Sequence, residues 1–285
     1  MRRIDLHCHP NTEPWYECNE PYIEELRRYW RRPWQPQPEE AVVAEIAAQG
    51  VEALMVAFDC ESVTGRPPCS NDYVTGLRDR FPDTIVGVWG SVDPHKGEHA
   101  IADAVRAVKQ LGVIGFHFHP ICGNFAVDDD ALYPLWETID DLGVPVLIDV
   151  GTTGMGAGAP GGLGRRISLS RPLPALDNLA AAFPDLTIIA AHPGWPWVDE
   201  MIAVALHKGN VFWELSGWAP KYFPEALRRE ISGRLRHKIM FGSDYPSLTH
   251  ARLIDEWQSL GYPDDVLQSV FAGNAERILG LGGAT

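Results

Sequence analysis

Two histidines near the start of the chain have the spacing of a metal-ligand pair. His7 and His9 lie in a short segment, residues 3–10, that begins as an apolar run. Alternate side chains of a β-strand point to the same face, so these two imidazoles would lie side by side. At the C-terminal end of a strand they would supply part of a metal site of the kind that parallel barrels carry. Two solvated histidines on an edge strand are the alternative when this motif stands alone.

Similar strand ends recur along the chain. One apolar run ends in His117 and His119, another ends in His192, and a third ends in Asp244; each end is followed by proline within two residues. Together with the His7/His9 segment, four strand ends carry residue types that can bind a metal. The chain has only 10 histidines, so chance is a poor explanation for this pattern. The sequence therefore predicts that these ends meet at one functional site.

The predicted chemistry is that of a metal-bound water. His7, His9 and Asp244 combine neutral nitrogen donors with a carboxylate, a set that suits Zn²⁺ and also Mn²⁺ or Fe²⁺. A metal lowers the pKa of its bound water to about 7, and Asp244 could accept that proton. His192 would act as a general acid or base near neutral pH. A serine nucleophile at Ser243 is disfavoured, because no Gly-x-Ser-x-Gly motif is present.

Composition excludes several classes of protein. The formal net charge of −14 argues against a nucleic-acid partner, because an acidic surface repels phosphates. The five cysteines are scattered and odd in number, which predicts neither a disulfide framework nor a zinc ribbon and favours a cytoplasmic location. No apolar run reaches the roughly 18 residues of a membrane span. No signal peptide is expected before the first strand.

Strands and helices are predicted to alternate. The apolar runs predict strands at residues 3–8, 52–58, 84–90, 113–119, 144–149, 187–192, 211–215 and 238–243. Helical periodicity or end signals predict helices at residues 101–111, 131–142, 172–183 and 197–207. Eight such units in 285 residues predict one α/β domain, a closed (β/α)₈ barrel that spans residues 1–285. A doubly wound open sheet is the alternative.

Three segments interrupt this alternation. Residues 11–38 form an insertion rich in Trp and Tyr after the first strand, which we interpret as a lid over the pocket, with a packing arm or oligomer contact as the alternative. Residues 151–164 are dense in glycine and form either a cradle for an anionic group or a flexible solvent loop. Residues 270–281 are predicted to form a C-terminal helix that caps the barrel.

The order of these motifs resembles the amidohydrolase superfamily, in particular the amidohydrolase-2 branch that includes aminocarboxymuconate semialdehyde decarboxylase. The motifs are His7-x-His9, His119-Pro120, Ala191-His192-Pro193-Gly194, Gly242-Ser243-Asp244-Tyr245-Pro246 and Asn274-Ala275-Glu276-Arg277. The resemblance implies a (β/α)₈ barrel with one divalent metal. By position it implies that His7, His9 and Asp244 are ligands and that His192 is the acid–base residue.

Two positions depart from the pattern of that branch. Its members commonly carry a ligand histidine at the end of strand 5, where this chain has Asp149, and related hydrolases often have Lys-x-His-Pro where this chain has His117-x-His119-Pro. Asp149 is therefore predicted as a further ligand, one that favours a harder metal such as Mn²⁺ over the Zn²⁺ otherwise expected. The alternatives are a metal shifted toward His117 and His119, a lost metal, or an Asp149 carboxylate paired with a neighbouring His or Arg.

Hydrolysis is the favoured reaction. Residues 151–154 and 216–224 resemble bacterial members linked to β-ketoacyl breakdown, which implies hydrolysis of an ester, lactone, amide or β-keto compound by activated water. Non-oxidative decarboxylation is the alternative, followed by a metal-free binding protein. The abundant aromatic side chains suit a small cyclic or aromatic substrate. The sequence leaves open whether the chain forms a homo-oligomer. The predicted substrate-binding residues are His117, His119, Trp15, Trp195, Trp218 and Tyr245.

Overall fold

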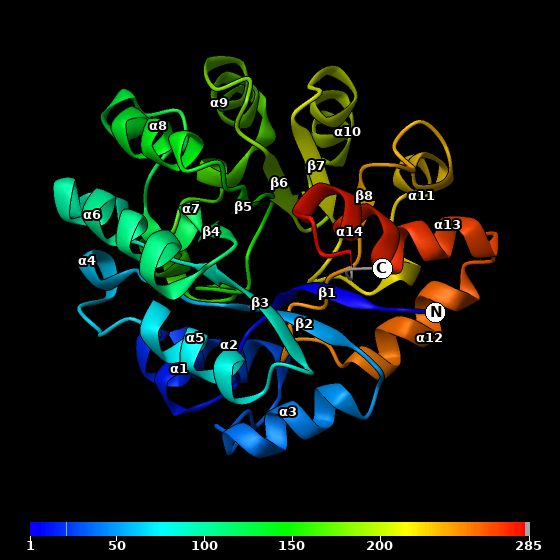
Figure 1. The fold of residues 1–285 in the computed structure, drawn as a ribbon, viewed down its shortest axis with the longest axis horizontal. Helices are drawn as coiled ribbons and strands as arrows, with labels where there is room; N and C mark the ends of the chain where they lie inside the picture. Colours follow the sequence, from blue (N-terminus) through cyan, green and yellow to red (C-terminus); the bar gives the residue numbers. More distant parts are fainter. Residues whose placement is uncertain (21, 283–285) are drawn as a thin grey trace.

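Eight parallel strands form the centre of the molecule (Figure 1). The computed structural model describes residues 1–20 and 22–282. Each strand pairs with the next along the chain, in the order β1 to β8. The strands are β1 (Ile4–Cys8), β2 (Glu52–Val56), β3 (Ile85–Gly90), β4 (Gly115–Phe118), β5 (Val146–Asp149), β6 (Ile188–Ala191), β7 (Val211–Glu214) and β8 (Ile239–Met240). All eight lie within the segments predicted as strands.

The segment after β8 joins β1 and closes the ring. Leu6 N donates a hydrogen bond to Phe241 O at 3.1 Å, and Asp244 N donates to His7 O at 2.8 Å. Strand β8 is shorter than the predicted 238–243, because Phe241 N donates to Val270 O at 2.9 Å instead of continuing the ladder. This sequential, closed order confirms the (β/α)₈ barrel and excludes the doubly wound sheet.

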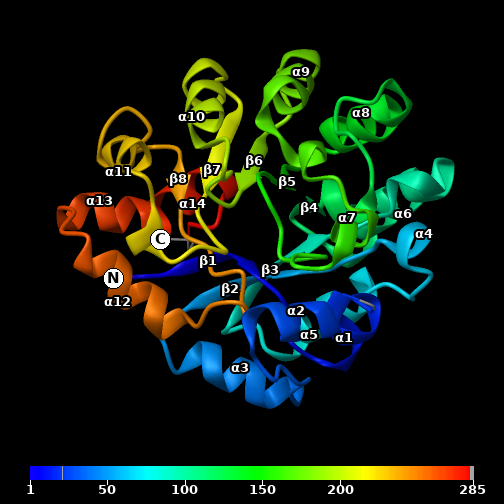
Figure 2. The same ribbon diagram turned by 180° about the vertical axis from the view of Figure 1, so that it is seen from behind.

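Helices follow the strands and surround the barrel (Figures 1 and 2). They are α1 (Glu13–Cys18), α2 (Tyr22–Trp30), α3 (Glu39–Ala47), α4 (Glu61–Thr64), α5 (Asn71–Arg80), α6 (Glu98–Arg106), α7 (Pro120–Gly123), α8 (Tyr133–Asp141), α9 (Asp177–Ala182), α10 (Val198–His207), α11 (Glu225–Ser232), α12 (His250–Ser259), α13 (Asp264–Gln268) and α14 (Asn274–Leu279). None of the described helices is both long and apolar enough to cross a membrane.

The four predicted helices are present with shifted limits. Helix α6 continues through a wider turn at Ala107–Leu111, so together they cover all of the predicted 101–111 and begin earlier, at Glu98. Helix α9 is shorter than the predicted 172–183, because Leu173 has an extended backbone that interrupts the turn Pro172–Leu176. Helices α8 and α10 lie within the predicted 131–142 and 197–207.

Two apolar clusters flank the strands. The inner cluster fills the barrel with side chains from most of its strands: Ile4, Leu6, Leu54, Val56, Trp89, Leu147, Ile189, Ala191 and Met240. The outer cluster lies between the strands and the surrounding helices. Ala272 and Ala275 also belong to the inner cluster, so the turn Ser269–Gly273 and α14 cover one end of the barrel. This is the segment predicted as a cap at 270–281.

Candidate active site

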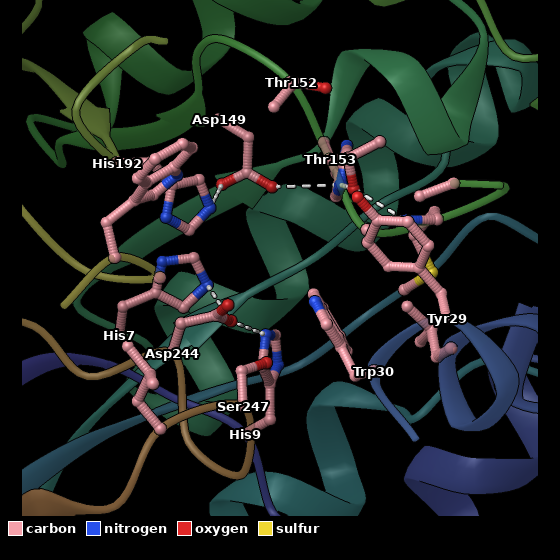
Figure 3. Close-up of a pocket in the computed structure, with 18 of the residues that line it drawn as sticks. His7, His9, Tyr29, Trp30, Asp149, Thr152, Thr153, His192, Asp244 and Ser247 are labelled. Atoms are coloured by element: carbon pink, nitrogen blue, oxygen red, sulfur yellow. Dashed lines mark hydrogen bonds and ion pairs between the residues drawn. The ribbon is translucent and has the colours of Figure 1, made fainter. Parts of the chain in front are cut away.

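A cavity of about 640 Å³ opens where the strands end (Figure 3). Barrels of this type carry their catalytic residues at that end, and the volume suits a small molecule. The ionisable residues from strand ends that line it are His7, His9, His119, Asp149, His192 and Asp244. Its aromatic walls include Trp15, Trp30, Trp34, Phe58, Trp195 and Trp218.

A bulge in β1 directs two consecutive side chains inward. Leu6 belongs to the inner core and His7 lines the cavity, although neighbours in a regular strand point to opposite faces. The register against β2 shifts between Asp5 and Cys8, which allows this change of direction. Asp5 Oδ1 accepts a hydrogen bond from His7 N at 3.0 Å and so stabilises the bulge. Bulges commonly re-aim side chains beside active sites.

His7, His9 and Asp244 form a triad of candidate metal ligands at the end of the cavity nearest β1. His9 Nε2 lies 3.3 Å from Asp244 Oδ1, and His7 Nε2 lies 4.0 Å from the same oxygen. One donor atom from each residue lies within 4.8 Å of the other two, so a single ion could contact all three. The structure thus brings together the three residues that the sequence analysis selected as ligands.

Glu214, at the end of β7, orients His7. Its Oε1 lies 3.0 Å from His7 Nδ1, which leaves His7 Nε2 facing Asp244. Burial lowers the pKa of His7 well below its ordinary value and raises the pKa of Glu214 to about 8. A neutral imidazole is the form that binds a metal. The positive charge of a bound ion would favour ionised Glu214, which would then accept the Nδ1 proton and leave Nε2 free to ligate. The sequence analysis did not include Glu214.

Asp149, at the end of β5, lies among three imidazoles. Asp149 Oδ1 is 3.2 Å from His117 Nε2 and 3.5 Å from His192 Nε2, and Asp149 Oδ2 is 3.4 Å from His119 Nε2. Burial would raise the pKa of Asp149, but the neighbouring histidines hold it well below its ordinary value. Asp149 also belongs, with His7 and His117, to a second group whose donor atoms lie within 4.8 Å of one another. Asp149 is therefore both an ion-pair partner of histidines and within reach of an ion bound at His7.

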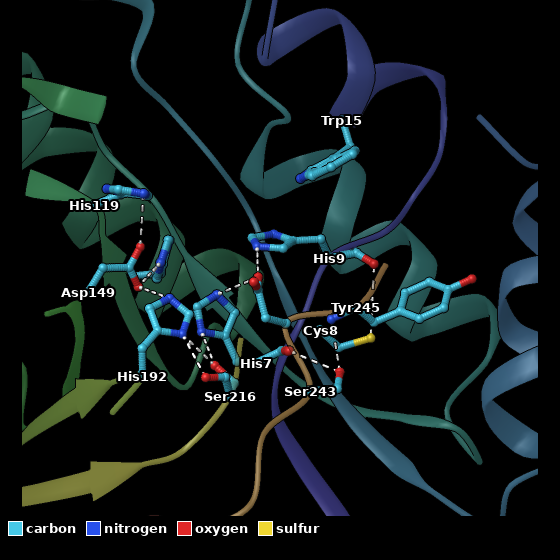
Figure 4. Close-up of polar contacts among 12 residues, drawn as sticks. His7, Cys8, His9, Trp15, His119, Asp149, His192, Ser216, Ser243 and Tyr245 are labelled. Carbon is cyan, nitrogen blue, oxygen red and sulfur yellow. Dashed lines mark hydrogen bonds and ion pairs between the residues drawn. The ribbon is translucent and has the colours of Figure 1, made fainter. Parts of the chain in front are cut away.

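His192 links Asp149 to Ser216 (Figure 4). Its Nδ1 lies 2.9 Å from Ser216 Oγ, while its Nε2 faces Asp149. Burial would lower the pKa of His192, but Asp149 with Asp244 and Glu214 raises it to about 10. His192 therefore holds a proton at neutral pH and is suited to act as an acid.

Two of these residues have a left-handed backbone. His192 has φ 71° and Asp244 has φ 56°, values that are uncommon outside glycine and that concentrate at functional sites. Ala191 belongs to the inner core and His192, the next residue, lines the cavity. The left-handed backbone of His192 allows both side chains to point toward the inside of the barrel although the two residues are adjacent in the chain.

Gly217→Ala is expected to impair turnover more than stability. Gly217 has φ +71°, and an added Cβ would lie 2.7 Å from His192 Nδ1 and 3.3 Å from Asp244 Oδ2. Gly65→Ala is the matched control, because its φ is +66° and nothing lies within 4 Å of its Cβ position. Gly65→Ala should cost about 1–2 kcal/mol of unfolding free energy, measured by urea denaturation, and Gly217→Ala should cost somewhat more because His192 must shift. Equal turnover in the two variants would contradict this placement of His192.

Asp5 connects the two strands that carry the triad. Besides His7 N, it accepts hydrogen bonds from Ser243 N at 2.8 Å and Ser243 Oγ at 2.5 Å, and its Oδ2 lies 2.7 Å from His250 Nε2. These contacts set the position of His7 relative to Asp244. Buried acids inside otherwise apolar strands, such as Asp5 and Glu214, are the sequence signal that would have identified this supporting layer.

The predicted substrate-binding residues differ in their positions. Trp15, His119, Trp195 and Trp218 line the cavity; the Trp15 ring lies 5.5 Å from that of His9, and Trp195 lies 5.8 Å from Trp218 between centroids. His117 is buried next to Asp149, so its side chain is a neighbour of the site that does not line the main cavity.

Tyr245 points away from the cavity, contrary to the position that its predicted role requires. Its side chain is buried, and its hydroxyl donates to Glu45 Oε2 at 2.7 Å and lies 3.3 Å from Asn11 Nδ2. The physical reason is the left-handed backbone at Asp244, which directs the aspartate to the site and the following tyrosine behind β1.

The insertion at residues 11–38 reaches the cavity, as a lid would. The described part contains α1 and α2, whereas residue 21 lies outside the described residues. Trp30 packs so closely on Gly154 that a Cβ there would lie 2.4 Å from the ring, and Tyr29 covers Gly158 in the same way at 3.0 Å. The glycine-dense segment 151–164 thus provides the surface on which these two aromatic side chains rest.

Comparisons with known proteins agree with this architecture. Among solved structures, an uncharacterised TIM-barrel protein from Bordetella bronchiseptica is 23% identical over 100% of both chains, with a TM-score of 0.79. A dihydroxybenzoic acid decarboxylase from Polaromonas sp. JS666, with bound manganese and the inhibitor 2-nitroresorcinol, is 18% identical over 99% of this chain and 98% of its own, with a TM-score of 0.71. A 5-carboxyvanillate decarboxylase from Sphingomonas paucimobilis is 20% identical over 99% of both chains, with a TM-score of 0.66.

At these identities the solved structures support the fold alone, and no curated protein matches the sequence significantly. A family model is more specific, because it responds to the sequence motifs as well as to the barrel. The model described as Amidohydrolase, of the amidohydrolase-2 type, matches residues 4–281. This range includes the triad, Asp149 and His192, so the chain belongs to the amidohydrolase family.

Proposed function

We propose that this enzyme is a metal-dependent, non-oxidative decarboxylase of a small, planar, unsaturated carboxylic acid. The observation that carries the proposal is the pairing, in one cavity, of a metal-ligand triad with His192, whose Nε2 lies 3.5 Å from Asp149 Oδ1. Two of the compared structures are decarboxylases of aromatic acids, which favours decarboxylation over the hydrolysis expected from the sequence. The aromatic walls suit a planar substrate.

The residues of the triad fit a divalent ion. His7, His9 and Asp244 would hold it, and His7 also belongs to a second donor group with His117 and Asp149. Burial keeps His7 neutral by lowering its pKa, the condition for ligation. The mixture of imidazole and carboxylate suits Zn²⁺ or Mn²⁺. The manganese in the compared dihydroxybenzoic acid decarboxylase supports Mn²⁺, and Zn²⁺ stays a prediction from the sequence. When bound, the ion would supply positive charge to a substrate carboxylate and an adjacent oxygen.

His192 would supply the proton that the reaction needs. Direct loss of CO₂ from an unsaturated carbon would leave a high-energy carbanion, so protonation of that carbon has to accompany or precede the break. His192 would transfer its proton to the carbon that bears the carboxylate. The bond to the carboxylate carbon then breaks, its electron pair returns to the unsaturated system, and CO₂ leaves. Asp149 holds the imidazolium in place for this transfer, and His192 regains a proton from water.

A product assay tests the proposal. The protein is stripped of metal, reloaded with Mn²⁺ or Zn²⁺, and incubated with dihydroxybenzoic acids and 5-carboxyvanillate, the acids named for the compared decarboxylases, and with related acids. Release of CO₂ that depends on the added metal supports decarboxylation. Cleavage of esters or lactones without CO₂ from any acid would instead support the hydrolase interpretation.

A further inference from the structure

The first residue of the insertion is joined to the residue that follows the triad aspartate. Asn11 is buried and has a left-handed backbone at φ 52°. Its side-chain Nδ2 donates to the Tyr245 hydroxyl at 3.3 Å, and its Oδ1 accepts from the Tyr16 hydroxyl at 3.0 Å. The Asn11 amide therefore links α1, which carries Tyr16, to the segment after Asp244.

The donors and acceptors of this hydrogen-bonded chain fit in one direction. The Tyr245 hydroxyl donates to Glu45 Oε2 at 2.7 Å, so it accepts from Asn11. Tyr16 donates to the Asn11 carbonyl, and the Asn11 amide nitrogen donates onward. Asparagine supplies both the acceptor and the donor, and it tolerates a left-handed backbone better than most residues. A buried chain in which every member is paired fixes the relative positions of its members.

Both tyrosine side chains are packed against other rings. The Tyr245 ring stacks on the His250 ring at 5.4 Å between centroids, and Tyr245 O accepts from His9 N at 3.0 Å. The Tyr16 ring contacts the Trp15 ring edge to face, at 5.0 Å between centroids. Trp15 in turn lies 5.5 Å from the His9 ring and lines the cavity (Figure 4). The hydrogen-bonded chain thus runs from the strands of the triad to the aromatic wall beside His9.

The later part of the insertion has separate attachments. Gln37 N donates to Asn11 O at 2.9 Å, and Arg32 Nη1, just after α2, donates to Ser247 O at 2.9 Å. Neither contact uses a tyrosine hydroxyl. Loss of one hydroxyl from the chain should therefore loosen α1 and leave α2 attached, which distinguishes a local effect from a general loss of stability.

We infer that Asn11, Tyr16 and Tyr245 are positioning residues for one wall of the cavity. They hold the Trp15 ring in place beside His9. None of the three lines the cavity, so they act through Trp15. A wall that is remote from the reacting bond contacts the substrate and the transition state about equally, so the chain should govern affinity more than the chemical step. The inference goes beyond the proposed function and holds for either reaction, because it concerns the shape of the cavity.

Removal of single hydroxyls tests the inference on the metal-loaded enzyme. Tyr245→Phe and Tyr16→Phe keep both rings, and each breaks the chain once. Hydrogen exchange measured by mass spectrometry should rise about fivefold in peptides that cover α1, as expected for the loss of one hydrogen bond. Exchange in peptides that cover α2 and the metal content should stay unchanged. The double variant should exchange no faster than the single variants, because either substitution already breaks the chain.

Kinetics supply the second measurement, with whichever assayed acid or ester the enzyme turns over. KM should rise about fivefold in both single variants, since wall contacts are lost, and kcat should stay close to that of the unmodified enzyme. Tyr262→Phe is the matched control, because the Tyr262 hydroxyl donates to Arg228 O at 2.8 Å and its ring does not line the cavity. This control should change neither the exchange of α1 nor KM.

Four results would overturn the inference. Exchange in α1 stays unchanged in both single variants, or it rises equally along the whole chain. The effects of the two substitutions add in the double variant, which would make them independent defects. Alternatively, kcat falls while KM stays the same, which would place the hydroxyls at the reacting groups. Failure to release CO₂ would count against the proposed reaction and leave the exchange results valid.

Discussion

Replacing both His7 and His9 with alanine is expected to remove the bound metal and to abolish turnover. The two imidazoles supply two of the three triad donors, and the remaining carboxylates, Asp244 and the neighbouring Asp149, should hold an ion far more weakly. A catalytic metal contributes several kcal/mol to the stabilisation of the transition state, so turnover should fall by roughly 10³- to 10⁵-fold. Elemental analysis of the purified protein measures the metal, and the CO₂ assay measures turnover.

The double variant His99→Ala plus His207→Ala controls for the loss of two histidines. Both residues are exposed, and neither lines the cavity, so metal content and turnover should match those of the unmodified enzyme. Equal metal content in the His7/His9 variant and in this control would show that the triad does not hold the metal. Circular dichroism of all three proteins checks that the barrel remains folded.

His192→Asn is expected to lower turnover by about 10²- to 10⁴-fold, the usual contribution of a general acid, and to leave the metal in place. Asparagine is the substitution of choice, because it tolerates the left-handed backbone that His192 adopts at φ 71°. A variant that loses its metal as well would assign His192 to ligation instead of proton transfer.

The pH profile of the Asp149→Asn variant tests specifically whether His192 is the proton donor. Activity should fall as pH rises through the pKa of His192, because the donor must be protonated. Asp149 raises that pKa, so removal of its charge should move the alkaline limb of the profile to lower pH. An unchanged alkaline limb would mean that Asp149 does not raise the pKa of the proton donor. Loss of the metal from this variant would show instead that Asp149 is a ligand.

The barrel and its triad were predictable because they depend on local patterns. Apolar runs separated by helical segments predict eight parallel strands, and parallel strands in a closed barrel bring their C-terminal ends together. His7, Asp149, His192 and Asp244 therefore meet although they are far apart in the chain. The order of the strands alone predicts that these residues meet, without knowledge of individual backbone angles or side-chain conformations.

The orientation of individual side chains depended on backbone irregularities that spacing does not reveal. A bulge in β1 turns His7 inward next to Leu6, and a left-handed residue at Asp244 turns Tyr245 away from the cavity. The supporting acids Asp5 and Glu214 were also not predicted, because they act through contacts between strands 7 or 8 and strand 1. Their partners become neighbours only after the barrel closes.

Isotope incorporation during turnover of a confirmed acid substrate tests the central claim most directly. The reaction is run in water labelled with both deuterium and ¹⁸O, and the organic product is analysed by mass spectrometry and NMR while the headspace gas is quantified. Proton transfer from His192 to carbon predicts one CO₂ per product, one deuterium at the carbon that carried the carboxylate, and no ¹⁸O in the organic product. A product that contains ¹⁸O and forms without CO₂ would contradict decarboxylation and identify hydrolysis by activated water.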